Sequence, residues 1–238
     1  GKGSFPDTYL KSDTLNNIFY KEEYYSELTF HYWYWKNLLK ISDNSWVGFC
    51  QKRRFWIKSS SSKDIISKEN IKEHLLVEPE NDWNKYQSII CKPISVAGAK
   101  KLKILKRGWR SLIKNPSILF NEEKQNIKLH FDMHHGYGNL ERAIDLLDVE
   151  DKSDFNNYVI NNSIFNPHIM FIAKKDILNK WFSKLFPWLE KCENQFGFDN
   201  LKGYDTKRLY AFLAERYLSF WFKKYTVYKE HPWVFIDS

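Results

Sequence analysis

The chain has 238 residues, and its 43% hydrophobic and 18% aromatic content excludes an intrinsically disordered protein, because such a composition can bury a core. Lys and Arg number 37 against 29 Asp and Glu, a net charge of +8 that favours an anionic partner: nucleotide phosphates, lipid phosphates or nucleic acid. A soluble protein with a basic surface is the alternative, since no apolar run reaches the roughly 18 residues of a membrane span.

The length predicts one domain, residues 1–238, and the cysteines indicate its compartment. Cys50, Cys91 and Cys192 lie far apart and form no C-x-x-C pair. Reduced, mostly buried thiols in a cytoplasmic protein are the simplest interpretation. We see no secretory signal in the opening residues, which agrees with that interpretation.

Residues 24–37, YYSELTFHYWYWKN, predict a helix crowded with aromatic side chains. Ser26 is the expected N-cap, and the acidic Glu27 suits a first helical turn. Leu28 opens a set of apolar side chains at helical spacing that should face the core. Glu27 and His31 lie one turn apart, so they form either a polar pair on the helix face or part of a binding site for a donor or acceptor sugar.

Residues 46–50, WVGFC, predict a short buried strand that is followed by Lys52, Arg53 and Arg54. Open α/β sheets bind anionic ligands beyond the carboxyl ends of their strands. Arg grips a phosphate with two parallel hydrogen bonds, so we expect this basic cluster to bind a diphosphate. A solvated turn, or Arg paired with nearby carboxylates, is the alternative.

The middle of the chain predicts a loop at 59–63, a short helix at 68–76 and a strand at 88–96 that breaks at Pro93. Residues 99–114 carry seven Lys or Arg interleaved with apolar residues, which predicts a basic amphipathic helix weakened by Gly108. We interpret this stretch as a helical insertion around 97–126. It either contacts an anionic membrane or is a solvated helix.

Ile127, Leu129 and Phe131 alternate with polar residues and predict a strand that ends at Asp132. Asp132 and His134 then have a spacing that could hold Mn²⁺ or Mg²⁺, although we assign no metal firmly. The alternatives for Asp132, His134 and His135 are a hydrogen-bonded tight turn or contacts to sugar hydroxyls.

The last third predicts a helix at 139–147, an apolar strand at 168–173 and a long helix at 176–195 with a kink at Pro187. Gly197 should end that helix. Asp205 should cap a final helix that runs to about residue 224, and terminal strands follow at 225–228 and 233–236. Strands that alternate with helices favour an α/β sheet.

Arg216 falls on the apolar face of the final helix, together with Leu209, Leu213 and Phe220. A buried guanidinium needs a partner, because an unpaired buried charge is very costly. Glu215 is adjacent in sequence, but neighbouring side chains diverge on a helix. We therefore expect the partner to be a ligand or a carboxylate from another element.

Three of these segments together resemble a known family. Residues 24–37, residues 47–55 and residues 212–218 (FLAERYL) are similar to segments of the "domain of unknown function 4422" group, which occurs among bacterial capsular and exopolysaccharide glycosyltransferases. The resemblance implies a GT-A-like α/β fold, a mixed sheet flanked by helices. It also implies transfer of a sugar from a nucleotide-sugar donor to a carbohydrate or lipid-linked oligosaccharide acceptor, at the inner face of the cell membrane.

The resemblance also implies roles for single residues. The basic cluster stands where generic GT-A enzymes carry a D-x-D metal motif, so Arg53, Arg54 and Lys52 would bind the donor diphosphate, assisted by Arg216. A carboxylate near the last helix would be the catalytic base, with Glu215 and Asp205 as candidates before Asp132. His168 stands in a strand on the acceptor side of related folds, where the family often has an asparagine.

Family members begin with a further strand that builds part of the nucleotide pocket, and we expect this chain to begin after it. The chain would then be a fragment, or would complete its sheet differently. A non-catalytic carbohydrate-binding or scaffold domain of a larger polysaccharide synthase is therefore the competing hypothesis. Nucleic-acid binding fits the charge, but the sequence has no RNA- or DNA-binding motif, so we expect no nucleic-acid partner.

Overall fold

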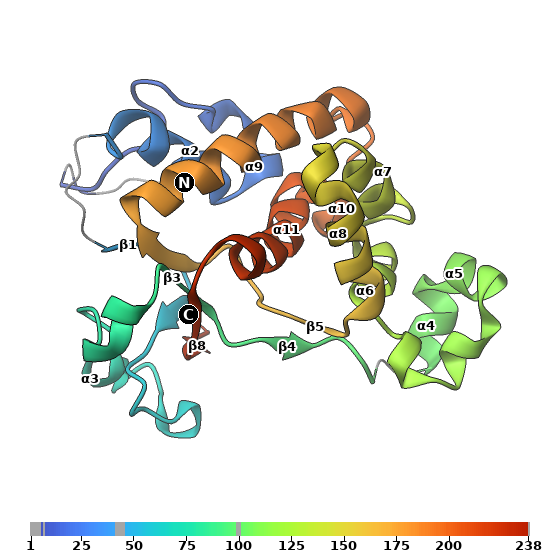
Figure 1. The fold of residues 1–238 in the computed structure, drawn as a ribbon, viewed down its shortest axis with the longest axis horizontal. Coiled ribbons are helices and arrows are strands. Elements are labelled where there is room, and N and C mark those ends of the chain that lie inside the picture. Colours follow the sequence, from blue (N-terminus) through green and yellow to red (C-terminus); the bar gives the residue numbers. More distant parts are fainter. Residues whose placement is uncertain (1–5, 7, 41–45, 99–100, 238) are drawn as a thin grey trace.

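A mixed four-stranded sheet lies at the centre of the computed structural model, which describes residues 6, 8–40, 46–98 and 101–237 (Figure 1). Its strand order is β1-β6-β3-β7, with β1 and β3 antiparallel to β6 and β7 parallel to β3. Two further pairs are β2 with β8 and β4 with β5, both antiparallel. The strand bounds are β1 Trp46–Phe49, β2 Arg54–Trp56, β3 Ser88–Cys91, β4 Ile94–Ser95, β5 Ile164–Phe165, β6 Phe171–Lys174, β7 Tyr228–His231 and β8 Trp233–Phe235.

The helices fall into two groups around this sheet. The first group covers one face and consists of α1 Glu22–Tyr25, α2 Leu28–Asn37, α9 Lys175–Phe196 and α11 Leu209–Tyr225 (Figure 1). The second group contains the other described helices: α3 Ile71–His74, α4 Lys101–Arg107, α5 Trp109–Lys114, α6 Ile127–His135, α7 Asn139–Asp145, α8 Val149–Asn161 and α10 Tyr204–Lys207. Short 3-10 turns are η1 Phe19–Lys21, η2 Lys63–Ile65, η3 Asn81–Lys85, η4 Pro116–Leu119 and η5 Glu122–Lys124.

Alternation along the strands divides the core between the two faces of the sheet, as a side-chain period of two requires. Ile90 and Phe171 face the large cluster formed with α2, α9 and α11. Ile89 and Ile172 face a smaller cluster with Trp56 and other side chains on the opposite side. A third cluster, which joins α4 and η4 to α6, contains Ile104, Ile118, Leu129 and Met133.

The predicted long helix and its end at Gly197 are confirmed, as are the strands at 46–49 and at 88–95 with the break at Pro93. Strand β1, however, lies at the edge of the sheet, and its Gly48 is exposed. The expected buried strand is therefore wrong except at Phe49. None of the described helices combines the length and the apolarity that crossing a bilayer requires.

Three local predictions are wrong for identifiable reasons. Ser26 is not an N-cap, since it has a φ of 52° and ends α1, so that Glu27 precedes α2. The final helix is interrupted at Arg208, which separates α10 from α11, and Asp205 lies inside α10. Residues 127–135 form the helix α6 and not a strand.

Lowering the pH from 7 to 5 should destabilise the fold through its buried histidines. Burial lowers the pKa of His31 to about 3, and those of His135 and His168 to about 4. The unfolded chain then binds protons near pH 6.5 that the folded chain does not, so stability is full above that pH and falls as the pH drops toward 4. Each histidine should cost about 2 kcal/mol by pH 5, and the melting temperature should fall on the order of 10 °C.

A His31→Leu variant provides the control, because leucine binds no proton. Its melting temperature should lose about a third of the pH dependence, since one of three similar contributions is removed. Calorimetry at both pH values measures the effect. An unchanged melting temperature of the parent chain between pH 7 and pH 5 would contradict the burial of neutral histidines.

Candidate functional site

The carboxyl ends of β1, β3 and β7 meet at one edge of the central sheet, which we call the carboxyl edge. The register places Phe49 and Ile90 opposite Phe171, and Cys91 opposite His231. Because β6 runs antiparallel to β1 and β3, the chain that enters β6 crosses this same edge. Residues 166–170 form that entering segment, and they supply the first functional side chains.

Asn166 locks the entering segment to three elements. Its side-chain amide donates to the Cys91 carbonyl (2.7 Å) and to Oε1 of Glu230 (2.9 Å). The hydroxyl of Ser219 on α11 donates to Asn166 Oδ1 (2.7 Å) and accepts from the Asn166 backbone NH (2.9 Å). Asn166 and Ser219 are both fully buried, so these bonds fix the segment relative to the sheet and α11.

His168 follows in a left-handed backbone conformation, with a φ of 69°. Its ring packs edge-on against Trp233, with 4.4 Å between the ring centroids. Burial lowers the pKa of His168 to about 4, so the imidazole is neutral at physiological pH. Its Nε2 is buried and has no hydrogen-bond partner among the described residues. A neutral imidazole with an unpartnered nitrogen can accept a proton or a hydrogen bond.

Glu215 connects His168 to Arg216. Its Oε1 accepts from the His168 backbone NH and lies 3.7 Å from His168 Nδ1, while its Oε2 accepts from Nη1 of Arg216. Burial alone would raise the pKa of Glu215, but Arg216, His168 and the hydrogen bonds outweigh it and hold the pKa below its ordinary value. Glu215 is therefore a carboxylate at neutral pH.

Arg216 is buried as the sequence predicted, with 2% of its side chain exposed. The expectation that its partner comes from another element or a ligand is wrong, because its carboxylate partner is the adjacent Glu215. The Arg side chain is long enough to turn back to its neighbour. Nη2 also donates to Nδ1 of His130 (3.2 Å), and the guanidinium lies 4.1 Å from the Phe165 ring centre. Its Nε is buried without a partner among the described residues.

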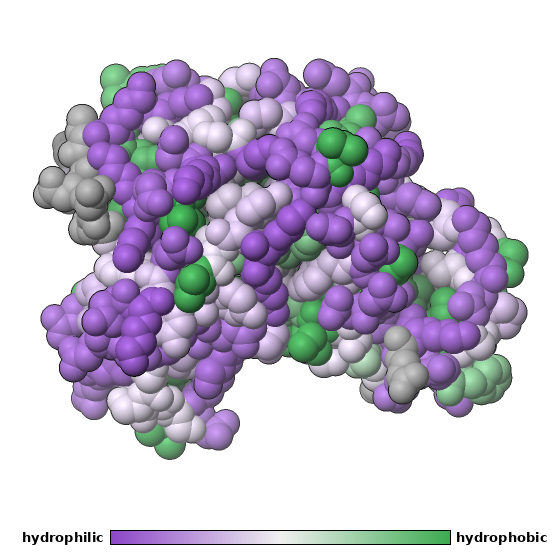
Figure 2. Space-filling view, in the orientation of Figure 1, coloured by the Kyte–Doolittle hydropathy of each residue, from purple (hydrophilic) through white to green (hydrophobic). Residues whose placement is uncertain are grey.

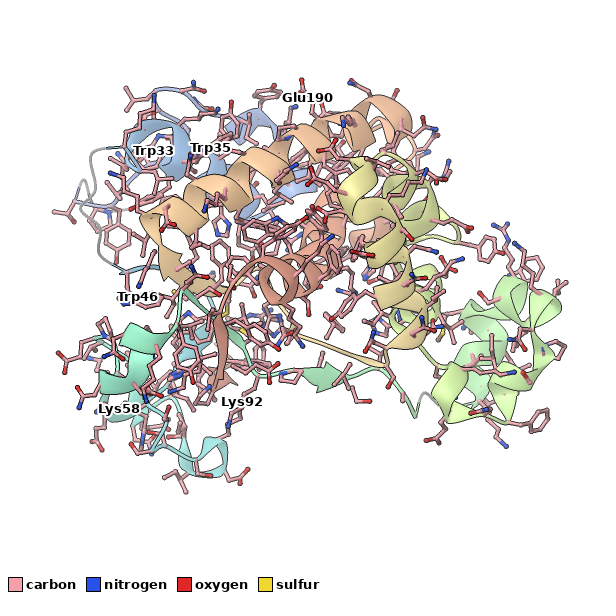
Figure 3. All side chains as sticks on the ribbon, in the orientation of Figure 1. Trp33, Trp35, Trp46, Lys58, Lys92 and Glu190 are labelled. Carbon is pink, nitrogen blue, oxygen red and sulfur yellow. The ribbon has the colours of Figure 1, made fainter. Side chains whose placement is uncertain are left out.

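Two further cations approach the carboxyl edge. Besides burial, which is the main cause, the charges of Arg54 and Lys63 each lower the pKa of His168. Lys63 Nζ is 4.3 Å from the centre of the Trp233 ring, the same ring that packs on His168. Trp233 is held in turn by a bond from its Nε1 to the carbonyl of Lys92 (3.2 Å), which is labelled in Figure 3.

The three residues of the basic cluster take different positions on a tight turn between β1 and β2. Arg54 is half-buried and donates to Gln51 Oε1 (2.9 Å). Arg53 points to Asp237 (3.0 Å) and is 47% exposed. Lys52 is exposed. The structure therefore brings Arg54 toward the candidate site and pairs Arg53 with a carboxylate outside it.

Helix α6 separates Asp132 from His134. Residues two apart on a helix point in different directions, whereas on the expected strand they would share a face. Asp132 Oδ1 accepts from the Gly138 backbone NH (3.0 Å), and burial raises the pKa of this carboxyl group. His134 donates from Nδ1 to the His130 carbonyl (2.8 Å). Within the described residues, no three His, Cys, Asp or Glu side chains are grouped so that they could hold a metal ion.

A cavity of about 200 Å³ lies between α6 and the segment that follows β4. His130 and His134 line it from α6, with their rings stacked at a centroid distance of 4.5 Å. Because His130 also accepts from Arg216, it stands between this cavity and the Glu215–Arg216 pair. The other lining residues are Ser95, Val96, Ala97, Gly98, Gln125, Asn126, Leu129 and Met133.

The remaining predicted site residues lie elsewhere. His135 donates from Nδ1 to the Asp205 backbone carbonyl (2.8 Å) and stacks on Phe212 at 3.7 Å. The Asp205 carboxylate is 48% exposed and pairs with Arg107 (3.4 Å). His31 is 1% exposed among aromatic rings of the core. Its backbone NH donates to the backbone carbonyl of Glu27 (3.2 Å), as in an ordinary helical turn.

Sequence reasoning missed Asn166, Lys63, Trp233 and His130. Asn166 lies in the connection between β5 and β6, and its partners Cys91, Glu230 and Ser219 are distant in sequence, so no local pattern predicts its role. Lys63 and Trp233 are brought together by the pairing of β2 with β8, which no local pattern predicts. His130 was assigned to a strand, and only the helical conformation turns it toward Arg216.

Comparison with known proteins gives two similarities. The family model described as "Domain of unknown function (DUF4422)" matches residues 2–226. Among solved structures, the chain is similar to the apo structure of the WbbM bifunctional glycosyltransferase, with 22% sequence identity and a TM-score of 0.71. The match covers 95% of this chain and 39% of that one, so the chain spans about two fifths of its length. The comparison with curated proteins gives no match. This likeness and the mixed sheet flanked by helices confirm the expected GT-A-like α/β class.

Replacing Arg216 by methionine should destabilise the protein strongly, because it leaves the Glu215 carboxylate buried without its counter-charge. Breaking one side of a buried pair costs about 3–5 kcal/mol. Denaturant unfolding of Arg216→Met measures the loss directly. The double variant Glu215→Gln/Arg216→Met removes both charges and should recover part of it. An unfolding midpoint unchanged by Arg216→Met would contradict the buried pair.

Proposed function

The chain belongs to the DUF4422 family, as residues 24–55 and 212–218 led us to expect, and we propose that it is a glycosyltransferase. It would transfer a sugar from a nucleotide-sugar donor to a carbohydrate acceptor. The fold shared with a glycosyltransferase chain supports the class of enzyme. Synthesis of a bacterial surface polysaccharide on a lipid-linked acceptor is the setting that the family resemblance suggests.

One observation carries the proposal: a neutral histidine and an ionised carboxylate lie among cations at the carboxyl edge. Glycosyl transfer needs a group that accepts the proton of the attacking hydroxyl, and positive charge for the diphosphate that leaves. His168 with Glu215 supplies the first, and Arg54 with Lys63 supplies the second. The two requirements are met by side chains that influence one another's charge, which favours a reaction centre over a surface patch.

We assign the donor diphosphate to Arg54 and Lys63 first. Arg54 can leave Gln51, a neutral partner, for a phosphate that offers two charge-assisted hydrogen bonds. Arg53 and Lys52 lie on the rim of the turn, and because Arg53 is paired with Asp237 we give the diphosphate contact to Arg54 in their place. Arg216 is buried and paired with Glu215, so it would add positive charge beneath the site without contacting the diphosphate itself.

His168 is the base that we propose, and Glu215 positions it. Both Glu215 oxygens already accept hydrogen bonds, so neither is free to take a proton, whereas Nε2 of His168 has no partner among the described residues. In a transfer that inverts the sugar carbon, His168 Nε2 takes the proton of the acceptor hydroxyl, the oxygen bonds to that carbon, and the bond to the diphosphate breaks with its electron pair. A bound diphosphate adds negative charge near the ring and raises the pKa of His168, which makes it a better base.

The cavity beside His130 and His134 is the proposed acceptor site. Its lining combines imidazole and amide groups with apolar side chains, a mixture that suits sugar hydroxyls and ring faces. His130 connects it to the reaction centre through Arg216. We make no metal part of this proposal.

Arg54→Ala should weaken binding of a nucleoside diphosphate by about 10- to 100-fold, the value of a lost charge-assisted hydrogen bond or two. Arg53→Ala is the matched control and should change affinity by less than about threefold, because an exposed ion pair contributes little. Isothermal titration calorimetry with UDP and GDP measures both variants.

Equal losses in the two variants would contradict the assignment of Arg54. Binding of oligosaccharide without binding of any nucleotide would instead favour the non-catalytic carbohydrate-binding domain.

His168→Gln should lower kcat by about 10²- to 10⁴-fold, the range of general base catalysis, while the affinity for nucleotide stays within a few-fold. The pH profile gives an independent readout. Since the pKa of His168 is about 4, kcat/KM should stay level from pH 8 down to about 5.5. An acid limb near pH 6.5, or a kcat unaffected by the substitution, would remove His168 from the mechanism.

A further inference from the structure

Helices α4 and α5 form a small unit beside the main body, at the lower right of Figure 1. Their inner face packs on α6 through Ile104 and Gly108, which are both buried. A Cβ on Gly108 would lie 2.9 Å from the Ile104 carbonyl and 3.3 Å from the Met133 side chain, so the backbone there is tightly packed. A bond from Gly108 N to Ile104 O closes the last turn of α4, and a bond from Leu112 N to Gly108 O opens the first turn of α5, so the two helices meet at Gly108.

The outer face of the same helices is also apolar. Leu102, Leu105, Trp109 and Ile113 are 81%, 48%, 51% and 72% exposed. Leu102 and Leu105 lie three residues apart on α4, and Trp109 and Ile113 lie four apart on α5, so each pair shares a face of its helix. We call these four exposed side chains the outer stripe. Figure 2 shows green side chains on this unit among purple ones. Ordinary surfaces expose large apolar residues singly, whereas a row of them marks an interaction site.

The region around the outer stripe is strongly basic. Residues 98–121 contain seven Lys or Arg and no Asp or Glu. Lys106 lies on α4 with Leu102 and Leu105, while Arg110 and Lys114 lie on α5 and approach the ring centre of Tyr137 at 5.8 and 5.6 Å. Lys101 lies 5.3 Å from the ring centre of Phe120, which is itself 81% exposed and adds apolar surface to the unit.

We infer that the outer stripe docks on an anionic lipid bilayer. Apolar side chains with Trp among them, flanked by Lys and Arg, are the composition of helices that lie in the membrane interface. The stripe would enter the headgroup boundary while the long cationic side chains reach the lipid phosphates. A nucleic acid would use the charge and leave the stripe in water, and a neutral protein partner would leave the charge unused.

This docking extends the proposed function, because it would hold the enzyme where a lipid-linked acceptor lies. The cavity with His130 and His134 is lined from α6, the helix on which α4 packs. The proposed acceptor site therefore lies on the helix that adjoins the unit carrying the outer stripe. Membrane binding itself needs neither donor nor acceptor, so it can be tested separately from catalysis.

Vesicle flotation tests the inference with the full chain and no substrate. The vesicles are phosphatidylcholine alone, or phosphatidylcholine with about a third phosphatidylglycerol to give an anionic surface. We expect binding to the anionic vesicles only, with a loss of about tenfold or more at 1 M salt, where surface charges are screened. Leu102→Ser/Trp109→Ser/Ile113→Ser and Lys106→Glu/Arg110→Glu should each weaken it by about tenfold or more.

Matched controls alter equally exposed residues elsewhere. Tyr20→Ser/Val77→Ser/Val149→Ser removes apolar surface, Lys68→Glu/Lys72→Glu reverses charge, and both should bind vesicles as the parent does. Equal loss in variants and controls, or retained binding in both stripe variants, would overturn the inference. A stripe that proves to bind a second copy of the chain in sedimentation experiments, or RNA in place of vesicles, would overturn it as well.

The test of membrane docking is independent of the test of transferase activity. If the chain is not a transferase, vesicle binding is unaffected. If the serine triple variant no longer binds vesicles, it should still transfer sugar to a water-soluble acceptor at the rate of the parent chain.

Discussion

The carboxylate of Glu215 accepts hydrogen bonds from two directions, from the guanidinium of Arg216 and from the backbone NH of His168. Buried charge demands such partners, because leaving one unpaired costs several kcal/mol. Arg216 is thereby held against Phe165 and His130, and His168 is held in a backbone conformation that a non-glycine residue rarely adopts. The chain entering β6, the centre of α11 and the start of α6 are therefore joined by one charge network at the sheet edge.

The same constraint shapes the chemistry that we propose. Both carboxylate oxygens of Glu215 accept hydrogen bonds, whereas Nε2 of His168 has no partner in the part of the chain that the structure describes, so the histidine is the group that can take a proton. Burial lowers the pKa of His168 and keeps the imidazole neutral, and the charges of Arg54 and Lys63, from β2 and η2, lower that pKa further. The site is thus electropositive while empty, and a diphosphate would relieve repulsion among its cations. Donor binding would therefore raise the basicity of His168, the group that activates the acceptor.

The sequence predicted the long elements well and the polar contacts poorly. Residues 175–196 show an apolar stripe that ends at a glycine, a pattern that few other structures satisfy. Residues 127–135 predicted a strand wrongly because α6 is covered on both sides. Leu129 and Met133 face α4 and η4, while Ile127 and Phe131 face the main core. A helix buried on two sides loses its polar face and imitates the alternation of a strand. The Glu215–Arg216 pair was missed because the rule for neighbouring side chains neglects the reach of arginine, and the approach of Lys63 to Trp233 depends on tertiary pairing.

The central claim is that the carboxyl edge of the sheet binds the donor diphosphate beside His168. A crystal structure of the chain soaked with UDP tests it most directly. We predict the diphosphate within hydrogen-bond distance of Arg54 and Lys63, with the Arg54 guanidinium released from Gln51. A structure in which Arg54 remains on Gln51 while the diphosphate occupies another surface would contradict the account.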